Sequence, residues 1–379
     1  MNKKNIIFYL IMFAMLFNVG CENPESGKEF PPTSITYSEI YLVNSDGTNL
    51  RKMTNGKNLI HYADFIPNSN KIFFIQTGIN FNGTNQVNGK QVICTMDLAT
   101  GTIDTVVEAN IYNDVTRVYE NREDQPRSIV VSQDGEKLYY AGRIPDMWSE
   151  RKDIFCVDIQ TKQLINLTNT ADNWAVGHFR LSFNETKIVY TEFEKGKQTS
   201  YLYVMDISGV NKKLLNTSDS TEFHFPQILA NNIDVLYVEF SKQQYGLGRL
   251  KILNMDSLTV TRVGLFNLSV FFFTELTKEN NIILQLYEQN ASPSIVNLFS
   301  LALIDLNMPS TAKPFFNKLQ NELFYFESDW VLKKVRFGGT LTTTTVNFAH
   351  SGGSTHVPQT SYTNDKIIFI NKNVFTIES

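Results

Sequence analysis

One phrase recurs along this chain: an apolar strand, a turn that carries Asp or Asn, and a short second strand. The clearest copy runs from Ile40 to Thr54 and turns at Asp46-Gly47. Further copies span 92–101, 154–162, 202–209, 250–259 and 299–305. The turn aspartates fall at 46, 97, 158, 206, 256 and 305, about 50 residues apart, a period typical of repeat architectures. The chain is therefore predicted to fold as a series of equivalent units.

A second phrase alternates with the first and reads strand, tight polar turn, strand. Its copies span 63–75, 129–140, 179–190 and 359–369, with weaker copies at 227–238 and 274–286. Asp, Asn and Gly supply the turn geometry, and β-branched or aromatic residues supply the flanking strands. Two hairpins in each period make four antiparallel strands, which is one blade of a β-propeller. The sequence thus predicts an all-β propeller of four-stranded antiparallel blades.

The spacing of the turns predicts the number of blades. After Asp305, 74 residues follow, and about a dozen more precede Asp46, which together make nearly two periods. Seven blades are therefore predicted, with 324–348 in the sixth. In the seventh, the C-terminal hairpin at 359–369 would join the N-terminal hairpin and remove an open sheet edge. The alternative is six blades with a long insertion at 338–358.

The N-terminus has the anatomy of an export signal. Met1–Asn5 is a short basic head, and the apolar run that follows to Gly20 is too short to span a bilayer comfortably. The junction Asn18-Val-Gly-Cys21 resembles the lipobox of bacterial lipoproteins, although Asn18 stands where a Leu-like residue is usual. The resemblance implies a signal peptide at 1–20 and lipidation of Cys21. A plain signal peptide cut near Gly20, or an uncleaved anchor, is the alternative.

The remainder of the chain divides into a tether and one domain. Residues 21–34 are polar, carry proline and lack apolar periodicity, so they are predicted to be a flexible tether, with the propeller at 35–379. The repeats resemble those of the TolB-type, WD-like β-propeller, whose turns read Asp-Gly-x-Asn and Ser-Pro-Asp-Gly-Lys. Ser45–Thr54 and Ser132–Lys137 carry this match. The resemblance implies the fold and says little of function, because propellers serve many purposes.

Four of the five histidines share one register. Each stands 9 to 10 residues before the Lys, or its equivalent, of the second phrase. These histidines are His61, His178, His224 and His356. An innermost strand begins at the rim of a propeller channel, so the four side chains are expected near the channel, as the separate pairs His356–His61 and His178–His224. Imidazole is a frequent metal ligand and the side chain most easily charged near neutral pH.

Two of these histidines belong to a shared His-x-Pro-Gln form, which ends at Gln227 and at Gln359. This form resembles the propeller lyases of oligogalacturonate, whose channel histidines and a glutamine hold a divalent metal. Three interpretations stay open for the register: hydrogen bonds that space the blades, contact with a bound ligand, or a metal site. The first is favoured, and no metal ligand and no catalytic residue is assigned.

The expected function follows from what is present and what is lacking. Neither a Gly-x-Ser-x-Gly elbow nor a Gly-x-x-x-x-Gly-Lys loop occurs, so serine-hydrolase and nucleotide-phosphate chemistry lack their signatures. The formal net charge of -4 argues against nucleic acid as a partner. The leading hypothesis is a monomeric binding module without a cofactor, anchored by its N-terminal lipid in the cell envelope, with the outer membrane favoured. Its partner would be an envelope protein or a glycan. The alternative is a metal-dependent lyase that acts in the channel.

Two further expectations concern loops and thiols. The polar stretches 77–90 and 110–125 interrupt the period and are predicted to be long loops of the kind that carry specificity. Cys94 and Cys156 occupy corresponding strands of neighbouring repeats, where they are predicted to be buried and unbridged.

Overall fold

The structure of the chain is a computed structural model that describes residues 34–376 with gaps. The longer gaps are 109–116, 119–128, 144–151, 244–247, 263–269, 287–293, 299–302, 306–314, 317–321, 337–341 and 348–353. The signal segment, Cys21 and nearly all of the predicted tether therefore lie outside the described residues. Contacts divide the chain into a unit Thr36–Val374 and a second unit made of the chain ends, Met1–Ile35 with Phe375–Ser379. The described residues form strands and turns, with no helix among them.

The sheet that follows the N-terminal hairpin shows how one period folds. Its strands are β3 (Asn58–Phe65), β4 (Lys71–Asn82), β5 (Asn85–Asp97) and β6 (Ile103–Glu108), paired antiparallel in the order β3-β4-β5-β6. The second phrase of the sequence forms the β3–β4 hairpin, and the first phrase forms the β5–β6 hairpin. The stretch 77–90, predicted to be a loop, instead continues β4 and β5 as a long ribbon, so that prediction was wrong.

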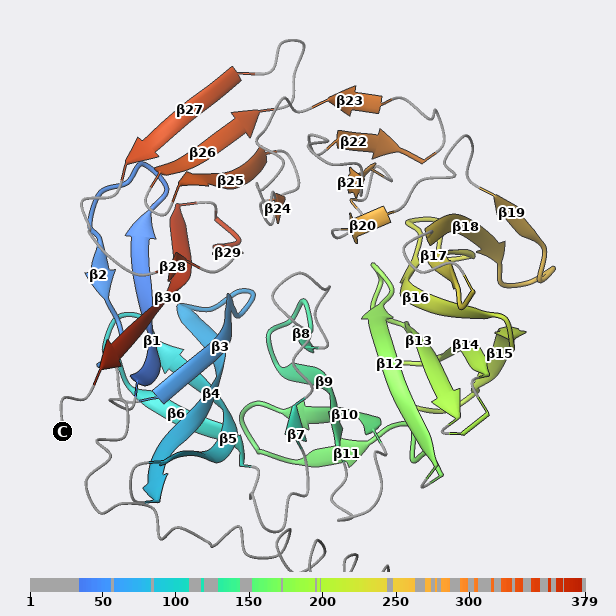
Figure 1. Ribbon diagram of the computed structural model, residues 1–379, viewed down its shortest axis with the longest axis horizontal. Helices are drawn as coiled ribbons and strands as arrows, with labels where there is room; N and C mark the ends of the chain where they lie inside the picture. The colour runs from blue at the N-terminus through green and yellow to red at the C-terminus, as the bar shows by residue number, and fades with distance from the viewer. Residues whose placement is uncertain are drawn as a thin grey trace, which may run out of the picture. The chain divides into compact units, whose positions relative to one another are not determined.

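The same strand order recurs along Thr36–Val374 (Figure 1). A nine-stranded sheet contains β7 (Arg117–Val118), β8 (Ile129–Val131), β9 (Lys137–Arg143), β10 (Lys152–Asp158), β11 (Leu164–Asn166), β12 (Trp174–Leu181), β13 (Lys187–Glu194), β14 (Ser200–Asp206) and β15 (Lys213–Ser218). Each group of strands that corresponds to one period is here called a hairpin set. A single parallel pair, Lys152 with Ala175, joins the set β7–β11 to the set β12–β15. Three four-stranded sheets follow: β16 (Thr221–Ile228), β17 (Asp234–Ser241), β18 (Gly248–Asn254) and β19 (Val260–Arg262); β20 (Val270–Phe273), β21 (Asn281–Leu286), β22 (Ser294–Asn297) and β23 (Leu303–Asp305); β24 (Phe315–Phe316), β25 (Glu322–Ser328), β26 (Val331–Arg336) and β27 (Thr342–Asn347).

The two ends of the fold meet in one sheet. Its strands are β1 (Ser34–Asn44), β2 (Arg51–Lys52), β28 (Ser354–Thr355), β29 (Gln359–Thr360) and β30 (Lys366–Thr376), with β1 paired to β30. Beyond the strands, the Ser45 N–H donates to the Asp365 carbonyl at 2.8 Å. The rings of Tyr41 and Phe369 stack with centroids 5.5 Å apart. The predicted closure by the N-terminal hairpin is thus confirmed, while the count of seven blades stays a prediction.

The core lies between neighbouring sheets. The second strand of most sheets carries a fully buried aromatic residue at one register: Phe74, Tyr140, Tyr190, Tyr237, Phe324 and Phe369. These rings pack with aliphatic side chains of the adjacent strands, as stacked sheets require. Cys94 and Cys156 are buried within these clusters and unbridged, as predicted, and burial raises the pKa of both thiols.

A recurring threonine explains one part of the repeated sequence. The Ile40 N–H donates to Thr54 Oγ1 at 2.9 Å, and the Ile154 N–H donates to Thr168 Oγ1 at 3.0 Å. Each bond ties the third strand of its set to the residue that follows the short outer strand. Thr54 and Thr168 therefore close two hairpins that only two or three residues of pairing would leave weak.

Candidate functional site

The described histidines of the shared register lie on the first strand of their sets: His61 on β3, His178 on β12 and His224 on β16. Figure 1 draws these strands on the inner side of their sheets. All three strands lose their pairing register at the histidine: between Ile60 and Tyr62, between Val176 and Phe179, and between His224 and Gln227. A bulge re-aims side chains and frees backbone groups, and bulges gather next to functional sites. Each described histidine of the shared sequence register therefore lies at a β-bulge.

His178 and His224 lie next to each other across the gap between two sheets. Their ring centroids are 5.3 Å apart, and the His178 ring lies 4.6 Å from that of Phe225. Neighbouring Phe179 is buried in the core, whereas the His178 ring lies at the bulge against the rings of His224 and Phe225. The adjacent pair that the register predicts is present.

The environment of His178 is unusual for an imidazole. Part of the residue is exposed, yet both ring nitrogens are buried and have no hydrogen-bond partner among the described residues. Burial, followed by electrostatic repulsion from His224, Arg180 and Lys152, holds the pKa of His178 well below its usual range. His178 is therefore a neutral ring with unused donor and acceptor capacity.

His224 is the accessible member of the pair. Its Nε2 lies 3.2 Å from Oε2 of Glu222, and the exposed fractions of the two side chains are 22% and 46%. This hydrogen bond to His224 is the main cause that lowers the pKa of Glu222. The rings of Phe240 and Phe225 lie 5.1 Å and 5.7 Å from that of His224. A hydrogen-bonded His224–Glu222 pair thus lies beside aromatic faces.

The other predicted site residues lie elsewhere or outside the described residues. The His61 ring nitrogen Nε2 is 2.8 Å from Thr77 Oγ1 on the adjacent strand. His356 is outside the described residues, so the predicted His356–His61 pair is untested. Gln227 and Gln359 are both buried, and Nε2 of Gln359 has no hydrogen-bond partner among the described residues.

A metal site requires at least three converging ligands. Within the described parts of the chain, no group of three or more His, Cys, Asp or Glu side chains is placed to hold an ion. The His178–His224 pair with Glu222 does not make such a group, because the His178 nitrogens are enclosed. The described residues alone therefore do not fit the metal that the lyase resemblance implies.

Sequence reasoning missed two parts of this site. Glu222 stands two residues before His224 in one strand, and that spacing places both side chains on one face, so the pair could have been found. The position of Phe225 depends on its backbone φ of 53°, in the left-handed region, where a phenylalanine is uncommon. No pattern in the sequence announces this conformation.

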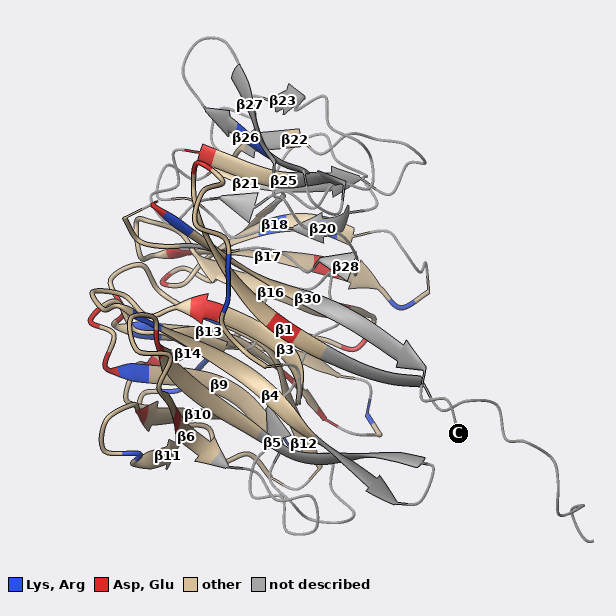
Figure 2. Ribbon diagram, turned by 90° about the vertical axis from the view of Figure 1, so that its left-hand side faces the viewer, with Lys and Arg blue, Asp and Glu red and all other residues tan. Residues whose placement is uncertain are grey.

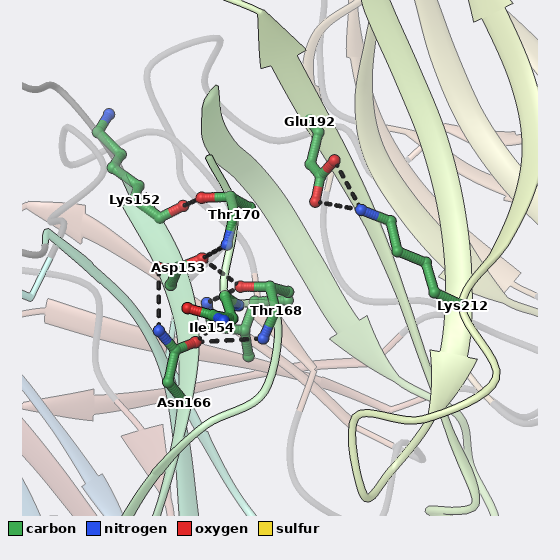
Figure 3. A network of polar contacts seen from close by, with 9 residues as sticks. Lys152, Asp153, Ile154, Asn166, Thr168, Thr170, Glu192 and Lys212 are labelled. Atoms are coloured by element: carbon green, nitrogen blue, oxygen red, sulfur yellow. Dashed lines mark hydrogen bonds and ion pairs between the residues drawn. The ribbon is translucent and has the colours of Figure 1, made fainter. Parts of the chain in front are cut away.

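Buried acids on β10 and β13 tie segments of the nine-stranded sheet together (Figure 3). Asp153 is fully buried and accepts hydrogen bonds from Thr168 Oγ1 at 2.6 Å, the Thr170 N–H at 2.7 Å and Asn166 Nδ2 at 3.0 Å. Both carboxylate oxygens of Glu192 accept from Lys212 Nζ at 2.9 Å. Burial is the main cause that raises the pKa of Glu192. These groups are satisfied within the fold, so they are assigned a structural role.

Comparison with known proteins defines the class of the fold. The chain matches the structure of an oligogalacturonate lyase in complex with manganese with a TM-score of 0.63 and 13% identity, covering 92% of this chain and 98% of that one. It matches the β-propeller domain of the Trilobed protease from Pyrococcus furiosus, described as having an open velcro topology, with a TM-score of 0.53 and 10% identity, covering 85% and 96%. The chain is thus an all-β propeller of four-stranded antiparallel sheets.

Comparison of the sequence alone gives no match, either to a protein-family profile or to a curated protein. A putative TolB from Agrobacterium tumefaciens matches with a TM-score of 0.46 and 13% identity, covering 90% of this chain and 100% of that one. A score this low carries no argument for the TolB resemblance. Among the described residues, no helix has the length and apolarity needed to cross a membrane.

Proposed function

We propose that this propeller is a lipid-anchored binding module of the bacterial cell envelope, with a protein or glycan as its partner. The observation that carries the proposal is the accessible His224–Glu222 pair beside the rings of Phe225 and Phe240. A carboxylate and an imidazole offer several acceptors and donors, and aromatic faces supply apolar contact area. This is the combination that recognises sugar hydroxyls or polar peptide groups. The basic head, apolar run and Gly20-Cys21 junction support the anchor.

The protonation states of two groups define polar contacts that this site offers. The lowered pKa of Glu222 keeps it a carboxylate, and the lowered pKa of His178 keeps that ring neutral at neutral pH. Glu222 therefore presents acceptor oxygens to a ligand beside an uncharged ring.

The binding role can be tested by calorimetric titration of the mature protein. The probes are a neutral oligosaccharide, an oligogalacturonate and a detergent extract of the host envelope. His224→Ala and Glu222→Gln are expected to weaken binding of the recognised probe about tenfold or more, as loss of a central polar contact does. Glu136→Gln alters an exposed acid in a turn of another hairpin set and serves as the matched control. Equal binding by wild type and both site variants would contradict the proposed role.

A second candidate is a metal-dependent polysaccharide lyase. The likeness to the manganese-bound oligogalacturonate lyase and the two His-x-Pro-Gln forms favour it. Metal analysis of the purified protein, with oligogalacturonate breakdown measured with and without added manganese, tests it. Stoichiometric bound metal together with metal-dependent breakdown of oligogalacturonate would establish the lyase. Loss of that breakdown in His356→Ala would place His356 in the site.

A further inference from the structure

The imidazole of His178 helps to hold the His224–Glu222 pair in position. The rings of His178, His224 and Phe225 contact one another and are named here the ring cluster. Their centroids lie 5.3 Å apart for His178–His224, 4.6 Å for His178–Phe225 and 5.7 Å for His224–Phe225. The His224 ring also meets that of Phe240 edge to face, at 5.1 Å. The orientation in which His224 reaches Glu222 therefore depends on where the His178 ring lies.

The ring cluster is held together at a conformational cost. Phe225 has a backbone φ of 53°, which a bulky residue keeps only where the surrounding structure imposes it. Its ring is buried in a cluster with Leu229 and Leu236, and it also contacts His178 of the neighbouring hairpin set. Both strands are bulged at their histidine. Strain and lost pairing at one place lower the free energy of opening there, so the β12–β16 junction is expected to open before the sheets that it joins.

The charges around His178 favour the neutral ring. Charged residues are few along the strands drawn in tan (Figure 2), and those that act on His178 are His224 on β16, Arg180 on β12 and Lys152 on β10. All three are basic, so each opposes a proton on His178. Burial, and then repulsion from these groups, lowers the pKa of His178.

No carboxylate compensates for a proton on His178. Both ring nitrogens are buried and have no hydrogen-bond partner among the described residues. The carboxylates of β13 and β16, and the buried Asp153 of β10, all have other partners within the fold. Glu222 is bonded to His224, Glu192 to Lys212, Glu194 to Lys197, and Asp153 to Thr168 and Thr170. A protonated His178 is therefore stabilised only by water, outside the ring cluster.

We propose that His178 is a pH-sensitive latch, whose protonated ring leaves the ring cluster in acid and thereby disassembles the His224–Glu222 pair. Part of the residue is already exposed, so the ring reaches water by a local opening of the β12–β16 junction rather than by unfolding of a sheet. Only the open state takes up the proton, so each pH unit below about 6.5, the ordinary pKa of histidine, favours that state up to tenfold. The inference rests on the proposed binding role and adds to it the release of a ligand in acid.

Hydrogen exchange read by mass spectrometry tests the latch on the mature protein without a ligand. Exchange is compared at pH values of about 7.5 and 5, which bracket the ordinary pKa of histidine. The reporters are the amides of β12 and β16, among them the His178 N–H, which donates to Thr191 Oγ1 at 3.0 Å. After correction for the intrinsic effect of pH, protection in both strands should fall about thirtyfold, which is tenfold for each of about 1.5 pH units.

Two comparisons show whether the proton acts at His178 and whether the opening is local. His178→Phe and His178→Asn have no proton to bind there, so the loss of protection should be absent from both, and a folding defect in one variant leaves the other. His61→Phe removes the histidine of the same register on β3 and should keep the loss. In wild type the loss should not depend on low concentrations of urea, because a local opening exposes little surface, whereas amides of β4 that exchange by global unfolding respond to urea.

Three outcomes would overturn the latch: equal protection of wild type at both pH values, an equal loss in wild type and both His178 variants, or a loss with the urea dependence of β4. Each of them leaves the binding role standing if calorimetry at neutral pH still detects a ligand that His224→Ala loses. Conversely, a protein that binds no probe but shows the expected loss of protection contradicts the binding role alone.

Discussion

The buried imidazole of His178 makes the stability of the protein depend on pH in a way that one substitution can remove. Its ring nitrogens are buried without partners, so a proton added to the folded state would leave a cation unsolvated next to Arg180 and Lys152. In the unfolded chain the same ring titrates with a pKa near ~6.5. The folded pKa is thus depressed, and the unfolded state binds a proton that the folded state refuses.

The sign and size of the effect follow from linkage. The contribution is fully present above the unfolded pKa and is lost as the pH falls from there towards the folded pKa. The slope rises to about 1.4 kcal/mol for each pH unit below the unfolded pKa, so lowering the pH from 6.5 to 5 should remove up to about 1.6 kcal/mol from the free energy of unfolding. His178→Phe keeps a ring against Phe225 and has no proton to bind, so this part of the pH dependence should disappear.

The assay is urea unfolding of both proteins at matched pH values between about 7.5 and 5, a range that brackets the ordinary pKa of histidine. Carboxylates and the other histidines are common to both proteins, so their contributions cancel in the difference between the two. The free energy of unfolding of wild type should fall faster with acid than that of His178→Phe by the stated amount. Parallel pH profiles would refute the reasoning and would mean that the ring is solvated or paired in the folded protein.

The remaining predictions concern the anchor, the closure and a turn. Cys21→Ala should leave the exported chain without lipid, released or uncleaved; a mature N-terminus mapped by mass spectrometry to another residue of the wild type would contradict lipidation. Deletion of residues 35–55 should cause aggregation or cost several kcal/mol, because it removes β1 and its buried aliphatic side chains from the closing sheet; an equally stable monomer, judged by light scattering and urea unfolding, would be inconsistent with closure. Gly135→Ala should destabilise more than Gly101→Ala, since both glycines have positive φ but only at Gly135 would a Cβ meet the Pro67 carbonyl oxygen, at 2.5 Å; equal losses in thermal unfolding would show that the turn yields.

The repeat could be predicted from the sequence because its signals are local. Each turn needs a residue that tolerates its dihedral angles, and Asp46-Gly47 and Gly135 announce such turns directly. The pairing of His178 with His224 was also predictable, because equivalent positions of adjacent repeats must face the same gap. The periodicity of the sequence was thus enough to predict the repeated strands and turns and to predict that His178 lies beside His224.

What could not be predicted depends on contacts distant in the chain. The stretch 77–90 is rich in Asn and Gly and reads as a loop, but pairing between its two halves extends β4 and β5 through it. The enclosure of the His178 nitrogens and the left-handed φ of Phe225 arise where two sheets meet. No window of sequence contains both sides of such a junction.

The pairing of β1 with β30 sets the order in which the protein can become complete. Strands that are neighbours in the finished sheet are separated by more than three hundred residues of chain, so this contact is the least local in the fold. During synthesis, β1 emerges early and has no partner until β30 has been made. Over that interval its edge is open to other chains, and a chaperone that covers extended strands would act on this protein at that stage. The final step of folding is therefore tied to the end of synthesis.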